Sequence, residues 1–109
     1  MNELIKKAES YVAASNDHDI PRIRPMLAPE CSYRSAGVGQ HDGVEAIMTM
    51  MQSFFAANPD VHWQTENYHQ RSDHVVFDFV ITLGTNSSSG VEEIHFDEAG
   101  KISRIVVQR

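Results

Sequence analysis

The sequence is short of several residue types, and each shortage argues against a class of protein. Its single cysteine, Cys31, cannot form an internal disulfide and has no second cysteine with which to build a zinc motif. Nine Lys and Arg residues against 15 Asp and Glu give a net charge of −6 without a basic stripe, so we expect no nucleic-acid partner. The apolar stretches near 47–57 and 75–83 are too short to span a bilayer, so no membrane partner is expected either. The opening MNELIKKAESYV carries charges where a signal peptide would be continuously apolar, which predicts a cytoplasmic protein.

What is present is typical of one globular domain covering residues 1–109, with 41% hydrophobic and 22% charged residues. Apolar residues three and four positions apart predict an amphipathic helix over 2–15. A second helix is predicted over 20–27, because Asp19 can cap it and Pro21 falls within its first turn.

A third helix is predicted over 43–57. Asp42 is its expected N-cap, with Glu45 three residues later as in a capping box, and Asn58-Pro59 ends it. Its apolar stripe contains two Met and two Phe residues, a pattern that suits either an ordinary core or a surface that adapts to a ligand.

Alternation with a period of two predicts the strands. Five are expected, at 31–35, 61–70, 74–84, 91–96 and 101–109, with loops at 36–43 and 84–90. The last four follow one another as an antiparallel meander. Helices that precede such a run of strands predict an α+β domain.

The stretch GVEEIHFDEAGKI contains an unexpected carboxylate. Alternation places Glu92 on the same face as Ile94 and Phe96. Either Glu92 lies at the frayed end of its strand and points to water, or this face lines a pocket and Glu92 is its polar member.

Three segments together carry a family resemblance: YVAASNDHDIPRIRPMLAPECSYRSAG, HDGVEAI and IHFDEAGKI. In this order and at these intervals they resemble the NTF2-like superfamily, which includes nuclear transport factor 2, SnoaL-like polyketide cyclases and ketosteroid isomerases. The resemblance implies a cone: three N-terminal helices packed on a curved antiparallel sheet, with a tapered central pocket. It also implies a homodimer formed through the outer face of the sheet.

The resemblance to ketosteroid isomerases also implies positions for catalytic groups. The tyrosine of the oxyanion hole falls on Tyr11, the protonated acid on Glu92, and the base on Ser35. A serine has no basic form at neutral pH, so Ser35 cannot remove a proton from carbon without an adjacent base. The remaining pocket residues implied are Cys31, Tyr33, Met51, Phe55, Trp63, Phe77, Phe79, Ile94, Ile105 and Val107.

Burial of Glu92 among these apolar neighbours would raise its pKa, unless an arginine such as Arg109 pairs with it. We therefore expect a SnoaL-like protein that binds a small hydrophobic carbonyl compound, as an isomerase, cyclase or hydratase. The alternative is a non-catalytic ligand-binding or dimerisation module of the same fold.

No cofactor and no metal are expected. The six histidines contain no H-x-x-x-H or H-x-H pair, and His41 and His74 are predicted to be solvated in turns, with His95 on the outer face of the sheet. Cys31 is interpreted as a buried, inert thiol rather than a nucleophile.

Overall fold

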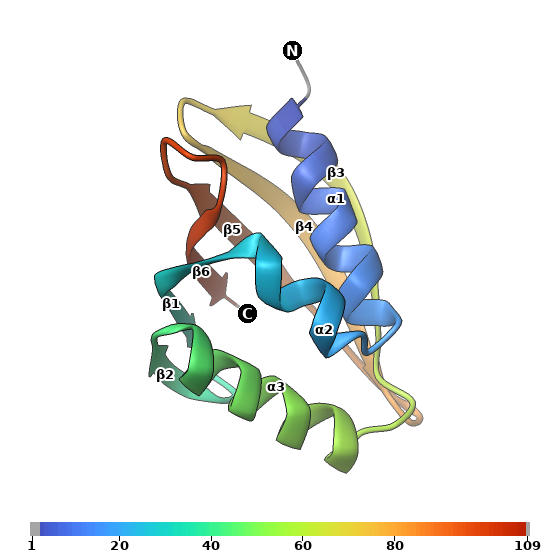
Figure 1. The fold of residues 1–109 in the computed structure, drawn as a ribbon. Coiled ribbons are helices and arrows are strands. Elements are labelled where there is room, and N and C mark those ends of the chain that lie inside the picture. Colours follow the sequence, from blue (N-terminus) through green and yellow to red (C-terminus); the bar gives the residue numbers. More distant parts are fainter. Residues whose placement is uncertain (1–2, 109) are drawn as a thin grey trace.

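The computed structural model describes residues 3–108, which form a curved sheet with helices over one of its faces (Figure 1). The elements in chain order are α1 (Glu3–Asn16), α2 (Ile20–Ile23), the 3-10 turn η1 (Arg24–Met26), β1 (Leu27–Ser35), β2 (Gly39–Asp42), α3 (Val44–Ala57), β3 (His62–Arg71), β4 (His74–Leu83), β5 (Asn86–Phe96) and β6 (Ile102–Gln108). The strand order is β2-β1-β6-β5-β4-β3. The predicted α+β class is confirmed.

The sheet buries one face against the helices, as the alternation in the sequence predicts. On β4 the side chains of Val75, Phe77, Phe79 and Ile81 are buried, while Val80 between them is 40% exposed. The meander of β3, β4, β5 and β6 is antiparallel throughout, as predicted. The concave face of this meander carries the core.

The end of α1 is tied to the beginning of β3 by one asparagine. The side-chain amide of Asn16 donates to the Trp63 carbonyl at 2.9 Å, and its oxygen accepts the Trp63 N–H at 2.7 Å. The buried stripe of α1 contains Tyr11 and Ser15. The two hydrogen bonds therefore hold this stripe over the sheet at a defined height.

The segment after α1 differs from the prediction. The second helix ends at Ile23 and becomes a 3-10 turn, because Pro25 has no N–H to continue an α-helix. The following strand begins at Leu27 rather than at residue 31, since Leu27 pairs with Ile102 of β6 across the sheet. Local patterns do not reveal such a distant partner.

The region 36–43 is also more regular than predicted. Residues 39–42 form β2, a hairpin partner of β1, instead of a loop. The N-cap of α3 is Gly43, with no side-chain cap, and not Asp42, whose carboxylate accepts a hydrogen bond from the Gln40 amide. A φ of +91° at Gly43 turns the chain sharply from the strand into the helix.

Two further expectations about the sheet were wrong. The pairing of β1 with β6 is parallel, so the sheet is not antiparallel throughout. Residues 86–90, predicted as a loop, extend β5 and pair with the end of β4. Ser and Gly have low strand propensity, but a continuous ladder to β4 satisfies their backbone groups.

No helix within residues 3–108 combines the length and the apolarity needed to cross a membrane.

Candidate functional site

A cavity lies between the concave face of the sheet and helices α1 and α3. Its volume is about 50 Å³, which is room for a few water molecules. The lining residues are Tyr11, Val12, Ser15, Tyr33, Ser35, Val38, Met50, Met51, Phe54, Phe55, Trp63, Phe79, Ile81, Glu92 and Val107. Most are apolar, and the polar ones offer four hydroxyl groups and one carboxyl group.

Glu92 is the ionisable acid of this cavity. The alternation of β5 directs its side chain inward with Ile94 and Phe96, and only 5% of the residue is exposed. Within residues 3–108 no side chain forms an ion pair with its carboxyl group. Desolvation raises the pKa of Glu92 to about 8. The carboxyl group is therefore mostly protonated at neutral pH and can donate a hydrogen bond.

Of the two interpretations of Glu92, the structure supports the inward one: the side chain is buried and lines the cavity. Arg109, considered as its partner, lies outside the described residues.

Tyr11 brings a phenol to the same cavity from α1. It is 4% exposed, and burial raises its pKa well above the ordinary value, with a further contribution from the negative charge of Glu92. One turn later, Ser15 donates its hydroxyl proton to the Tyr11 carbonyl at 2.9 Å. A phenol held neutral in this way is a hydrogen-bond donor at every physiological pH.

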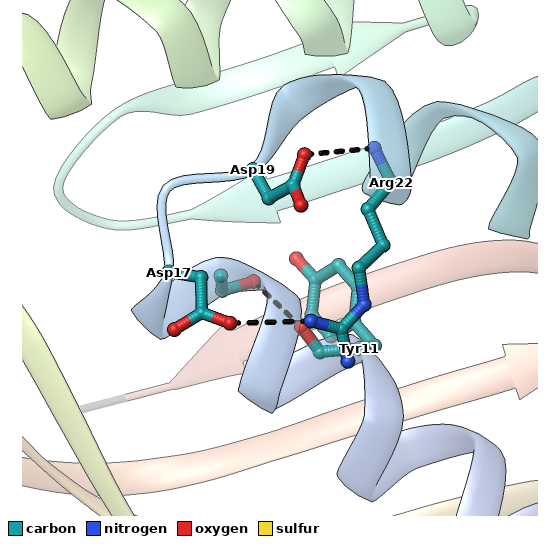
Figure 2. A network of polar contacts seen from close by, with 5 residues as sticks. Tyr11, Asp17, Asp19 and Arg22 are labelled. Atoms are coloured by element: carbon teal, nitrogen blue, oxygen red, sulfur yellow. Dashed lines mark hydrogen bonds and ion pairs between the residues drawn. The ribbon is translucent and has the colours of Figure 1, made fainter.

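Polar contacts hold the turn after α1, and Figure 2 shows them. Asp19 Oδ1 accepts the backbone N–H of Arg22 at 3.2 Å, and the Arg22 guanidinium contacts Asp17 at 3.2 Å. The Asp17–Arg22 pair is largely exposed and therefore contributes little stability. The backbone bond from Asp19 N–H to the Ala14 carbonyl at 3.0 Å defines the turn more firmly.

Ser35 and Tyr33 come from β1. Ser35 is buried, and its hydroxyl oxygen accepts the N–H of Gly37 at 3.1 Å. Within the described chain no histidine, aspartate, lysine or arginine lines the cavity beside it. Among the described lining residues, Glu92 is therefore the acid or base that shares the cavity with Ser35.

Aromatic rings from α3 and β3 make up one wall of the cavity. Trp63 lies 6.1 Å from Phe54 and 6.3 Å from Phe55, between ring centroids. His18 stacks on Phe55 at 4.4 Å, and its Nε2 lies 3.2 Å from the Val61 carbonyl oxygen. Val61 is buried and Trp63 half-buried, whereas His62 between them is exposed.

The structure brings most of the predicted pocket residues together. Tyr11, Glu92, Ser35, Tyr33, Met51, Phe55, Trp63, Phe79 and Val107 all line the cavity. Cys31, Phe77, Ile94 and Ile105 do not line it, because they are buried in the packed core beneath it. The lining residues Val12, Ser15, Val38, Met50 and Phe54 were not among the predicted pocket residues. The helical stripe of α1 contains the first two, but Val38 lies in a turn that local patterns could not place.

The thiol of Cys31 is fully buried, and desolvation raises its pKa to about 12, which agrees with its interpretation as an inert group.

The positions of His41 and His74 differ from the prediction that both are solvated in turns. His74 is half-buried at the first position of β4, and its ring stacks on that of His95 with centroids 4.3 Å apart. His41 lies within the strand β2. Asp73 joins the two stacked histidines in a cluster on the face of the sheet opposite the cavity.

A family model described as the SnoaL-like domain matches residues 8–105. The chain belongs to the SnoaL-like family. Among curated proteins, none matches the sequence.

Solved structures confirm the fold of this SnoaL-like domain. An uncharacterised cystatin-fold protein from Novosphingobium aromaticivorans superposes with a TM-score of 0.87 at 18% identity, covering 95% of this chain and 96% of that one. A proposed polyketide cyclase from Sinorhizobium meliloti has a TM-score of 0.85 at 16% identity, covering 94% of each chain. A proposed isomerase of the SnoaL-like family from Agrobacterium tumefaciens has a TM-score of 0.83 at 19% identity over both full chains. The predicted NTF2-like, cystatin-like cone is confirmed.

Proposed function

We propose that this SnoaL-like protein binds a small hydrophobic carbonyl compound in the cavity, with protonated Glu92 donating a hydrogen bond to the carbonyl oxygen. The observation that carries the proposal is a buried carboxyl group that faces a largely apolar cavity and has a pKa raised to about 8. A protonated carboxyl group can donate to an uncharged acceptor without any charge being brought into the apolar cavity. A ketone or ester oxygen has this property, whereas a carboxylate or phosphate ligand would find no cation among the described lining residues.

Tyr11 is the second donor in this proposal. Its phenol and the Glu92 carboxyl group both line the cavity, and a negative charge on Glu92 would raise the pKa of Tyr11 further. Two neutral donors at one carbonyl oxygen would stabilise negative charge that develops there in an enolisation, ring closure or hydration. Isomerase, cyclase and hydratase reactions share this requirement.

Such a reaction also requires a base that removes a proton from a carbon atom of the ligand. Ser35 itself has no basic form at neutral pH, and Glu92 is the acid or base with a pKa near neutrality among the described lining residues. Any abstraction of a proton from carbon would therefore fall to the ionised form of Glu92. One carboxyl group cannot both donate to the oxygen and accept from the carbon in the same step.

A second candidate function is therefore a non-catalytic ligand-binding module. The observation that favours it is the volume of about 50 Å³, which is too small for a ligand of two fused rings in the present side-chain arrangement. Met50, Phe54 and Trp63 are only half-buried along the lining and are the side chains whose rotation would enlarge the cavity.

Comparing a ketone with its hydrocarbon counterpart tests the proposal. We would titrate the protein with a single-ring ketone, cyclohexanone, and with its hydrocarbon counterpart, cyclohexane, at pH 6 and pH 9, following cavity amide resonances by NMR. The proposal requires tighter binding of the ketone at pH 6, a smaller preference at pH 9 where Glu92 is ionised, and a preference independent of pH in Glu92→Gln. Tyr11→Phe should weaken ketone binding at both pH values. Equal affinity of the wild type and both variants for the two compounds would contradict the proposal.

Hydrogen–deuterium exchange at the α-carbon of the bound ketone distinguishes the two candidate functions. Exchange that the wild type accelerates and Glu92→Gln does not would support catalysis by enolisation. Binding without acceleration would support the non-catalytic module.

The outer face of the sheet supports a further part of the proposal, a homodimer. Val80 is 40% exposed there, and Val76 and Val106 on the same face are only half-buried in the single chain. The alternating burial along β4 and β6 places these valines on the face opposite the cavity, and the helices in Figure 1 lie over the other face of the sheet. A second copy packed on this face would remove them from water.

A further inference from the structure

Two histidines meet on the outer face of the sheet, at the end of the β3–β4 hairpin. The antiparallel register of β4 and β5 places His74 directly opposite His95. Their neighbours Val75 and Ile94 are completely buried on the other face, so both imidazoles project outward. The rings are stacked, with centroids 4.3 Å apart and planes 15° apart.

Two carboxylates approach this pair from its edges. Asp73 Oδ1 lies 3.3 Å from His74 Nδ1, and Glu93 Oε1 lies 3.1 Å from His95 Nε2. One ligand atom from each of Asp73, His74 and His95 lies within 4.8 Å of the other two. We propose that Asp73, His74 and His95 form a binding site for a first-row transition-metal dication, with Zn²⁺ as the ion that fits best and Glu93 as an auxiliary ligand.

The distances allow coordination after small side-chain rotations. Donor atoms around a tetrahedral Zn²⁺ with bonds of about 2.0–2.1 Å lie about 3.3 Å apart. The longest separation in the cluster is at most 4.8 Å, so closure requires movements of about 1.5 Å or less. Directly opposed residues on neighbouring antiparallel strands have Cβ atoms close enough for such rotations without backbone movement.

The backbone beneath the cluster is held in place. The Asp73 carbonyl accepts the N–H of Phe96 at 3.1 Å, which ties the hairpin turn to β5 beside His95. Arg71 pairs with His74 to close a two-residue turn, in which Ser72 has a φ of +55°. The side chains of His74 and His95 are only 23% and 20% exposed, so their positions are restricted while one edge stays accessible to an ion.

The donor set decides the class of metal. Imidazole nitrogens with a carboxylate suit Zn²⁺, Cu²⁺ and Ni²⁺, whereas Mg²⁺ and Ca²⁺ prefer oxygen ligands throughout. The surrounding charge is balanced: Arg71 and Arg104 flank the histidines on β3 and β6, and Asp73 and Glu93 oppose them. Affinity for the ion would therefore come from the imidazole bonds and not from a general acidic field.

The site is separate from the cavity, which lies on the other face, so this inference does not depend on the proposed function. Asp73, His74 and His95 leave the fourth tetrahedral position to Glu93 or to water. A bound ion would also join β4 to β5 next to the hairpin turn and stabilise the native state.

Calorimetry with the full, untagged chain tests the inference, since a polyhistidine tag would bind the same metals. After treatment with a chelator, wild type should bind one Zn²⁺ per chain, with a rise in melting temperature. His74→Gln, His95→Gln and Asp73→Asn should each lose at least about tenfold in affinity. His69→Gln, which removes an exposed histidine of β3 on the same face, is the matched control and should bind like wild type.

Spectroscopy on the wild-type protein also tests the metal site, and it does not depend on a variant that folds. Histidine side-chain ¹⁵N resonances should shift on addition of Zn²⁺ for His74 and His95 and stay unchanged for His62 and His69. Co²⁺ in place of Zn²⁺ should give the visible absorption of a low-coordinate site. Absence of saturable binding, shifts at other histidines, or half an ion per chain, which would place the metal between two copies, would overturn the inference.

Discussion

Because the carboxyl group of Glu92 is buried, we predict how the free energy of unfolding depends on pH. Burial raises the pKa of Glu92 from its ordinary value of 4.5 to about 8. Between these values the folded protein keeps a proton that the unfolded chain has lost. The free energy of unfolding therefore falls as pH rises. The stabilising contribution is fully present below pH 4.5 and is lost by about pH 8.

The size of the effect follows from the same two values. Each pH unit in the interval corresponds to about 1.4 kcal/mol. Relative to its value below pH 4.5, the free energy of unfolding is then lower by about 3 kcal/mol at pH 7 and by about 5 kcal/mol above pH 8. These are upper figures, since an ionised carboxylate can draw water into the cavity that it faces.

Glu92→Gln removes the charge while keeping the size of the side chain. We expect this variant and wild type to differ little in urea unfolding at pH 5, and the variant to be more stable by several kcal/mol at pH 9. Glu66→Gln on β3 is the control, because Glu66 is exposed and its replacement should leave a curve parallel to that of wild type. Parallel pH profiles for wild type and Glu92→Gln would refute the assignment of a buried, desolvated acid.

Three further predictions follow from particular contacts. Gly90→Ala would place a methyl group in a clash with the Gln108 carbonyl oxygen, so we expect the free energy of unfolding to fall by at least about 2 kcal/mol in chemical denaturation. Asn16→Ala removes both hydrogen bonds to the Trp63 backbone and should cost about 1–3 kcal/mol, with a change in Trp63 fluorescence; an unchanged midpoint would show that this link is dispensable. Val80→Glu should convert the proposed dimer into a monomer by light scattering, and a monomeric wild type at micromolar concentration would contradict the dimer itself.

The elements whose evidence is local were predictable from the sequence. The third helix was predicted over 43–57 and spans Val44–Ala57, because its apolar stripe and the Asn58-Pro59 stop lie within one segment. The inward direction of Glu92 followed from alternation along β5 and from the family resemblance. Tyr11 likewise follows from the stripe of α1.

Features that depend on distant partners were not predictable in this way. β1 begins at Leu27 because β6 offers it a parallel partner 75 positions later. Cys31 and Ile105 alternate in the same sense as true lining residues, yet they lie in the core beneath the cavity. Alternation tells which face a side chain occupies, but the curvature of the sheet and the height of the helices decide where space remains.

The histidines show the same division most clearly. The sequence by itself determined that His95 lies on the outer face, because a strand alternates with a period of two. Only the tertiary structure decided that His74, 21 residues earlier, lies opposite it with Asp73 alongside. The register of two strands is a property of the whole sheet, since it depends on the turn that joins the strands and on the core that both bury.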